Sequence, residues 1–388
     1  MEQPHGFVDP QHPNHICLLQ KSLHGLKQAP RAWYERFNQY LLKFGFSNSV
    51  CDTSMFIYQK GDARMILLVY VDHIILVGSS DDLLQSFINS LKNKFSMKDL
   101  GPLHYFLGIE ATYDSPAKKL LLTQNKYSLD LLKKHDMLGC KICKTLVAQG
   151  QSASLCDETS QYDSTSYRSL VGGLQYLTLT RPDISFAVNY VSQFLHYPTD
   201  IHLQLDKRIL RYIKGSLGQG LTLSSGNCSE PQSYSDSDWD GCPYTNKFTS
   251  RYCVFIGGNL VSCSSKKQQT ISRSSIEAEY RGLANETTEI LWISYLFEEL
   301  LVHLSLPCKF FFDNQGTGSV TTNPIFHART KHIEVDYHMI CDLDKFGFLR
   351  VSYVHTSHQI AELFTKGLSK SQFSVLKDKL MPHVRTSV

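Results

Sequence analysis

The chain has 388 residues, of which 42% are hydrophobic and 19% charged, and its formal net charge is +3. This composition is typical of a globular protein and excludes wholesale disorder, and the near-balanced charge means that any polyanion site must be a local patch. The length exceeds that of one ordinary core, so two or three domains are expected.

The polar, proline-rich start and the irregular spacing of the 11 cysteines favour a reducing compartment, cytoplasmic or nuclear. The longest apolar run, residues 65–77, falls short of the roughly 20 residues that span a bilayer, so a soluble protein without a membrane segment is expected.

Helical and strand-like segments alternate in the first half of the chain. PRAWYERFNQYLLKFGF carries Trp33 and Phe37 at helical spacing and then Gly45, which predicts a helix that ends there. MILLVYV and IILVG predict two strands that meet at Asp72 and His73, followed by a helix in DDLLQSFINSLKNKF. LHYFLGIEATY and KKLLLTQ predict a hairpin, and helices are predicted in YRSLVGGLQYLTLT, PDISFAVNYVSQFL and LQLDKRILRYIKG. A seam follows at residues 215–234, where Gly, Ser and Pro interrupt the helical pattern.

A different domain is predicted after the seam. QSYSDSDWDG predicts a strand that ends in acidic residues, and SRYCVFIGGNLVSCSSKK predicts a hairpin that turns at Gly257, Gly258 and Asn259. A long helix over residues 275–301 precedes a buried strand in CKFFFDNQG. A helix in EVDYHMICDLDKF, a strand in LRVSYVHT and a last helix in HQIAELFTKGL complete the pattern. This order predicts an α/β domain with a mixed sheet.

Acidic residues gather at four places in this second domain. Asp236 and Asp238 lie two apart on one strand and share a face, for which a solvated strand end is the competing interpretation. Ser274 and Glu277 match a capping box, which leaves Glu279 one turn into the helix, at the border of its core-facing side.

Two further carboxylates complete the set. Asp313 ends an apolar strand, where a functional group or a turn-forming residue is expected, and Glu362 lies in the first turn or two of the predicted last helix. Four acids from four separate elements could hold two hard cations about 4 Å apart, as in two-metal phosphodiester hydrolysis.

Seven longer motifs run through the chain: KSLHGLKQAPRAWYERF, LLVYVDHIILVG, SLVGGLQYLTLTRPDISFAV, SDSDWDG, SRSSIEAEYRGLAN, FFDNQG and FHARTKHIEVDYH. In this order, over nearly the whole chain, they closely resemble the Pol polyprotein of copia-type LTR retrotransposons. The resemblance implies an α+β and α/β multidomain fold, with a partial reverse transcriptase palm and thumb before a ribonuclease H-like mixed-sheet domain. We expect a truncated palm at 1–135, a thumb- or connection-like helical region at 136–228, the ribonuclease H-like domain at 229–372 and a C-terminal tail at 373–388.

The resemblance also implies a disabled polymerase. The family's hairpin tip carries two adjacent aspartates; Asp72 matches the first and His73 replaces the second. The family's first polymerase motif lies just upstream of MEQPHGF, so we expect that strand to be absent. A neutral imidazole supplies neither the charge nor the oxygen that Mg²⁺ prefers. Asp72 and His73 are therefore interpreted as a vestigial polymerase site, with a rewired site for a softer metal as the alternative.

The ribonuclease H half is predicted to be better preserved. The resemblance places catalytic metal ligands at Asp236, Glu279 and Asp313, and Glu362 stands where the family has an aspartate. The added methylene moves the carboxylate by more than about an ångström, whereas catalytic groups tolerate roughly 0.5 Å. We therefore expect a two-metal Mg²⁺ or Mn²⁺ site with reduced activity or a shifted metal preference.

Two basic and aromatic segments are candidates for contact with nucleic acid. The expected binding residues are Lys27, Gln28, Arg31, Arg329 and Lys331. For the first segment we expect a mixed role, in which the aromatic residues of the helix are core and the cations face solvent.

The leading hypothesis is a retrotransposon-derived reverse transcriptase and ribonuclease H fragment that binds RNA–DNA hybrids and retains metal-dependent cleavage of RNA. The alternative is a non-enzymatic nucleic-acid-binding or decayed remnant. A second Pol chain is the other partner considered.

Overall fold

The structure is a computed structural model that describes residues 2–18, 25–71, 73–146, 162–226, 231–238, 247–272, 274–313 and 334–382. The chain forms two compact units, Met1–Gly101 and Pro102–Val388. Residues 102–135, which the sequence assigned to the palm, lie in the second unit, and the division into four domains stays a prediction.

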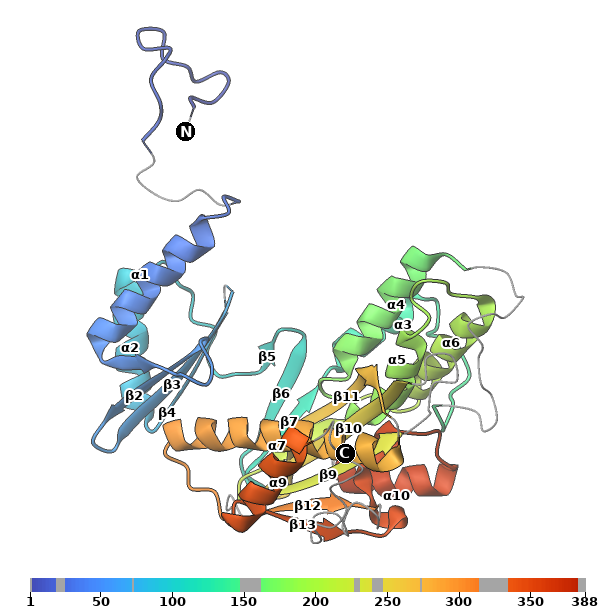
Figure 1. Ribbon diagram of the computed structural model, residues 1–388. Coiled ribbons are helices and arrows are strands. Elements are labelled where there is room, and N and C mark those ends of the chain that lie inside the picture. The colour runs from blue at the N-terminus through green and yellow to red at the C-terminus, as the bar shows by residue number, and fades with distance from the viewer. Residues whose placement is uncertain are drawn as a thin grey trace. The chain divides into compact units, whose positions relative to one another are not determined.

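The first unit is a four-stranded antiparallel sheet that shares a core with two helices (Figure 1). Its elements are α1 (Ala29–Phe44), β1 (Phe46–Asn48), β2 (Met55–Lys60), β3 (Ala63–Tyr70), β4 (His73–Gly78) and α2 (Asp81–Lys94), and the strand order is β1-β2-β3-β4. Pro30 lies in the first turn of α1, and Gly45 ends the helix with a φ of 114°, as the sequence predicted. Phe37, Phe56 and Phe87 are fully buried between the helices and the sheet, so aromatic packing holds this unit together.

The β3–β4 hairpin has the tight tip that the sequence predicted. Tyr70 pairs with His73, so only Val71 and residue 72 make the turn, and residue 72 lies outside the described residues. Val71 has a φ of 52°, a left-handed conformation that is strained for a β-branched residue. Its side chain is 77% exposed, so little packing compensates for that strain.

The second unit begins with a second antiparallel sheet and a group of helices. The sheet has the order β5-β6-β7-β8, with β5 (Tyr105–Phe106), β6 (Ile109–Asp114), β7 (Lys119–Thr123) and β8 (Gly220–Ser224). The helices are α3 (Asn125–Lys134), α4 (Ser164–Leu177), η1 (Pro182–Ile184), α5 (Ser185–Ser192) and α6 (Asp200–Lys214). Strand β8 lies inside the predicted seam, which is therefore not simply a linker. A Cβ atom at Gly220 would overlap the Leu122 carbonyl, so glycine permits the close approach of β7.

A five-stranded mixed sheet forms the rest of the second unit, as predicted. Its order is β11-β10-β9-β12-β13, antiparallel from β11 to β9 and parallel from β9 to β13. Its elements are β9 (Gln232–Asp238), β10 (Lys247–Ile256), β11 (Asn259–Ile271), α7 (Ser275–Glu299), β12 (Cys308–Phe312), α9 (Glu334–Lys345) and β13 (Leu349–Tyr353). The hairpin turns at Gly257 and Gly258, which both have positive φ.

The C-terminal part differs from the prediction. Glu362 lies in a short 3₁₀ helix, η5 (Ile360–Phe364), which follows η4 (Thr356–His358), and not in an α-helix. An additional helix, α10 (Lys370–Leu380), occupies much of the predicted tail. Its buried residues Phe373, Leu376 and Leu380 recur every three or four positions, an amphipathic pattern that should have been interpreted as a helix.

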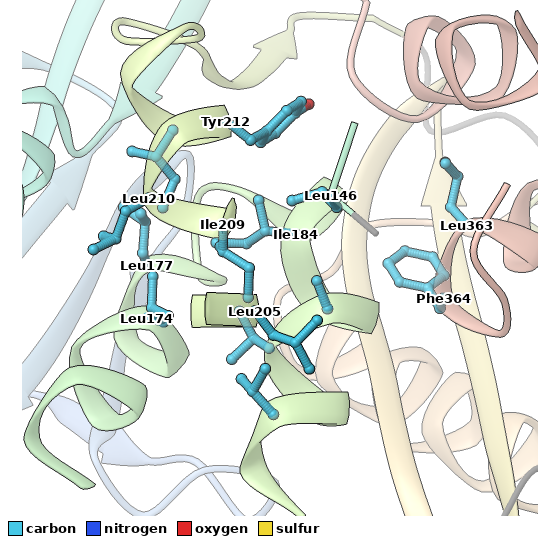
Figure 2. Close-up of a cluster of buried hydrophobic side chains, with 14 of the residues drawn as sticks. Leu146, Leu174, Leu177, Ile184, Leu205, Ile209, Leu210, Tyr212, Leu363 and Phe364 are labelled. Atoms are coloured by element: carbon cyan, nitrogen blue, oxygen red, sulfur yellow. The ribbon is translucent and has the colours of Figure 1, made fainter. Parts of the chain in front are cut away.

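Each face of the mixed sheet has its own core. Helices α7 and α9 share one core with Val254 and Phe310 of the sheet. On the other face, Cys253 and Phe255 belong to a continuous core that joins helices α3 to α6 with η5 and α10. Figure 2 shows Leu363 and Phe364 of η5 in the same cluster as side chains of the helices. The helical region and the mixed sheet therefore fold as one packed unit.

These features confirm the predicted fold class, α+β and α/β with a small palm-like sheet followed by a mixed-sheet unit. Within the described residues, no helix combines the length and the apolar character needed to cross a membrane.

Candidate ribonuclease site

Two of the predicted carboxylates lie level with each other on neighbouring parallel strands. Phe310 pairs with Ser233 and Phe311 with Tyr234, so continuing the register by two residues places Asp313 beside Asp236. Neighbouring strands are about 4.8 Å apart, which brings two acidic side chains to one edge of the sheet. The prediction that strand ends carry the functional acids therefore has a direct geometric basis.

Asp236 is surrounded by charged and polar groups. Burial and the nearby Asp313 carboxylate raise the pKa of Asp236 to about 6, while a hydrogen bond with Thr365 and the charges of Arg251 and Lys366 lower it. Arg251 lies directly opposite Asp236 on β10, and it is 4% exposed. The structure therefore places the Arg251 side chain inside the unit, next to this acid.

Glu279 approaches the same place from α7. Ser274 caps the helix by accepting a hydrogen bond from the Glu277 backbone N–H, and the Glu277 carboxylate pairs with Arg281 at 2.9 Å. Glu279 is 7% exposed, in agreement with the core-facing position inferred from spacing. Its pKa is raised well above the usual value by burial and by the Asp236 and Asp313 carboxylates, which a hydrogen bond from the Ser237 backbone partly offsets.

Asp313 is oriented by a residue from η4. The Thr356 hydroxyl donates a hydrogen bond of 3.0 Å to its carboxylate. His355 and His358, on either side of Thr356, are exposed, and each contacts the Ser357 hydroxyl through its Nδ1 atom. The hydrogen bond from Thr356 to Asp313 therefore connects η4 to the acidic edge of the sheet.

Glu362 is the fourth predicted carboxylate, and it is fully buried. The fully buried Gln359 holds η5 in place by donating hydrogen bonds to the Ser235 carbonyl of β9 and the Phe311 carbonyl of β12. Glu362 Oε1 pairs with the Lys366 ammonium at 2.5 Å, and Oε2 accepts a 2.7 Å hydrogen bond from the Gln372 amide. Burial and Asp313 raise the pKa of Glu362, and the hydrogen bond and charge of Lys366 act against that rise.

The donor chemistry fits a hard divalent cation at three of these carboxylates. Asp236, Glu279 and Asp313 are oxygen donors. Burial and the neighbouring carboxylates raise the pKa values of Asp236 and Glu279, and a cation would relieve the repulsion between the acids. Across the described part of the chain, no group of three or more His, Cys, Asp and Glu side chains is arranged as a ready ligand set. A cation would therefore have to draw the three carboxylates together, and Glu362 already has protein partners on both oxygens.

The predicted polymerase residues lie in the first unit. Asp72 is outside the described residues, and His73 is the exposed first residue of β4. The structure therefore shows the hairpin that would present the pair but not the Asp72 side chain.

The predicted nucleic-acid contacts are only partly described. Lys27 and Gln28 are exposed just before α1, and Arg31 is exposed on the helix, 3.1 Å from Glu35. Trp33 stacks on the fully buried Phe37 at 5.0 Å, so the aromatic residues are core and the cations face solvent, as predicted. Arg329 and Lys331 lie outside the described residues.

Sequence reasoning missed the groups that hold the carboxylates. Lys366 lies four residues after Glu362, a spacing that would have suggested the pair. Thr356, Thr365 and Gln372 come from other turns and helices, and no local pattern links them to the acids.

Comparison with known proteins gives the family. The family described as reverse transcriptase (RNA-dependent DNA polymerase) matches residues 1–149. The retrovirus-related Pol polyprotein from transposon RE1 of Arabidopsis thaliana is 46% identical over 380 residues, 98% of this chain and 26% of that protein. A putative transposon Ty5-1 protein of Saccharomyces cerevisiae is 31% identical over 294 residues, 75% of this chain and 94% of that protein.

The chain thus spans about a quarter of the length of the Pol polyprotein that it matches over nearly its whole sequence. Among solved structures, the foamy viral protease–reverse transcriptase in complex with dsDNA has 12% identity and a TM-score of 0.43, covering 86% of this chain and 60% of that one. A similarity this low carries no functional argument. The sequence relatives show that the chain belongs to the Pol family of copia-type LTR retrotransposons, with residues 1–149 matching the reverse transcriptase family.

Proposed function

We propose that the second unit cleaves the RNA strand of RNA–DNA hybrids and that the first unit does not polymerise. The observation that supports cleavage most strongly is the register that puts Asp236 level with Asp313, with Glu279 electrostatically coupled to both. Asp236 and Glu279 repel each other and Asp313; Arg251 and Lys366 offset part of the repulsion at Asp236, and a bound cation would offset more of it.

Asp236, Glu279 and Asp313 would hold Mg²⁺ or Mn²⁺. A bound divalent cation would activate the attacking water and would stabilise the charge that develops on the leaving 3′ oxygen. Thr356 fixes the orientation of Asp313, and Thr365 does the same for Asp236. The 2′-hydroxyl is the chemical group that distinguishes the RNA strand from the DNA strand.

Loss of polymerase activity follows from His73 in the hairpin. A neutral imidazole cannot replace a carboxylate as a Mg²⁺ ligand, because Mg²⁺ prefers charged oxygen donors. The exposed Lys27 and Arg31 near α1 support contact with a nucleic-acid backbone. This surface also favours the second candidate function, binding of nucleic acid without cleavage.

The test is incubation of the purified chain with an RNA–DNA hybrid labelled on the RNA strand, in Mg²⁺ and then in Mn²⁺. We expect cleavage that the isosteric Asp313→Asn variant lacks, and no primer extension on a primed template. Cleavage that does not exceed that of Asp313→Asn in either metal would overturn the enzymatic proposal. Retained hybrid binding in that case would leave the non-enzymatic function.

A further inference from the structure

Glu362 is held by protein groups in a way that the other three carboxylates are not. Its oxygens contact the Lys366 ammonium at 2.5 Å and the Gln372 amide at 2.7 Å, and the residue is fully buried. Its neighbours Leu363 and Phe364 lie in the core of the second unit, so η5 cannot shift without disturbing that core. A metal ion that approached Glu362 would meet the positive charge of the Lys366 ammonium on one oxygen and the Gln372 amide on the other.

Lys366 brings a positive charge to the acidic edge of the sheet. Its side chain is 57% exposed, although its ammonium contacts a fully buried carboxylate. Partial burial lowers the pKa of Lys366, but the Glu362, Asp236 and Asp313 carboxylates outweigh that effect and raise it. The Lys366 ammonium therefore interacts electrostatically with three of the four acids, at the end of a side chain that is more than half exposed.

We propose that Lys366 replaces one of the two cations, so that the site binds a single divalent cation at Asp236, Glu279 and Asp313. Lys366 neutralises Glu362, which becomes a positioning residue for the lysine and not a metal ligand. The partly exposed Lys366 side chain is then placed to contact an oxygen of the phosphodiester group. This inference rests on the proposed function for its substrate, but the cation count can be measured without any substrate.

A purely structural ion pair would be a different explanation of the same contact. It would contribute to stability and leave metal stoichiometry unchanged when Lys366 is replaced. The cation count therefore separates the two explanations.

The experiment is a Mn²⁺ titration of the full chain without nucleic acid, with free Mn²⁺ measured by electron paramagnetic resonance. We expect one Mn²⁺ per chain in the wild type and two in Lys366→Met, because that change releases Glu362. Lys379→Met, an exposed lysine on α10, is the matched control and should bind one. Two ions in the wild type, none in the wild type, or one ion in a folded Lys366→Met variant would each overturn the proposal.

A second variant keeps the test decisive if Lys366→Met does not fold. Glu362→Gln should bind one Mn²⁺ with an affinity within about threefold of the wild type, whereas loss of a true ligand costs far more than the roughly 10–100-fold of an outer-shell change. A loss of Mn²⁺ affinity in Glu362→Gln as large as that expected for a true ligand would overturn the proposal. Hybrid cleavage with two bound ions would refute this inference alone, and one bound ion without cleavage would refute the proposed function alone.

Discussion

The β3–β4 hairpin tip in the first unit and the ends of β9 and β12 in the second are the two places where the sequence predicts catalytic carboxylates. At the hairpin, Val71 is 77% exposed and His73 is also exposed. At the strand ends, Glu279 is 7% exposed and Glu362 is fully buried. One site projects into solvent, and the other is enclosed by side chains from several elements.

This difference predicts that the two sites tolerate substitution differently. An exposed turn residue has few neighbours, so replacing an aspartate with a histidine there has little effect on stability. The second site is built from interlocking contacts, in which Thr356, Gln359 and Lys366 each bind a carboxylate or a strand backbone. A substitution there alters charge balance and packing together. The proposed loss of polymerase activity at the hairpin therefore does not require loss of the fold.

The largest expected effect is on cleavage in the second site. Asp236→Asn should lower the initial rate of hybrid cleavage by about 100-fold or more, because it removes a charged metal ligand. The corresponding change at the hairpin, His73→Ala, should leave the rate unchanged. The melting temperature of Asp236→Asn should be equal to or above that of the wild type, because the amide no longer repels Asp313. An equal loss of cleavage rate in Asp236→Asn and His73→Ala would contradict the difference between the two sites.

The second-largest expected effect is on the stability of the core that supports the second site. Phe364 is 1% exposed in the core that joins η5 to the helices. Phe364→Ala should lower the free energy of unfolding by about 3–5 kcal/mol, because it leaves a cavity. Urea unfolding measures this change. Phe346→Ala, at a residue that is 84% exposed, is the control and should stay within about 0.5 kcal/mol. A small effect at Phe364 would mean that η5 is not anchored by this core.

Local sequence patterns predicted the elements wherever the signal is carried by neighbouring residues. Gly45 as a helix stop, the Gly257–Gly258 turn and the Ser274 cap all depend on short-range geometry. Strand β8 was missed because its pairing with β7, about 100 residues earlier in the chain, is not visible in a local window.

The site was predictable to a similar extent. Spacing separated the roles of Glu279 and Glu277 but not their burial, since both are buried, and Glu277 follows the helix cap and pairs with Arg281. The spacing of four residues between Glu362 and Lys366 suggests their pairing, but no local pattern indicates that Gln372 reaches Glu362 from α10. Sequence identified the acids, but tertiary contacts decide which of them are free to bind a cation.

A buried carboxylate without partners provides an internal contrast to Glu362. Asp206 on α6 is fully buried, and neither of its oxygens has a hydrogen-bond partner in the described chain. Burial raises the pKa of Asp206 to about 8, from an ordinary value of 3.8. The folded state therefore holds this proton more tightly than the unfolded state does. The stabilisation that protonated Asp206 gives to the folded state is complete below about pH 4 and is lost as the pH rises toward about 8.

The test is urea unfolding of the wild type and Asp206→Asn between pH 5 and pH 9. The wild type should lose stability relative to the variant over this range, by on the order of a few kcal/mol. Asp130→Asn, at an exposed position on α3, is the matched control and should follow the wild type. A constant difference between wild type and Asp206→Asn across the range would contradict the raised pKa.

The smallest expected effect concerns the hairpin tip itself. Val71→Gly should raise the free energy of unfolding by about 0.5–1 kcal/mol, because it relieves a left-handed β-branched residue, while the flexibility of glycine offsets part of the gain. Val50→Gly is the matched control, since Val50 is 91% exposed and has no positive φ, and it should stabilise nothing. Urea unfolding measures both variants. If Val71→Gly is destabilising, the tip is held by contacts that the exposure of Val71 does not reveal. The hairpin tip would then resemble the enclosed site of the second unit and would not be a loosely held turn.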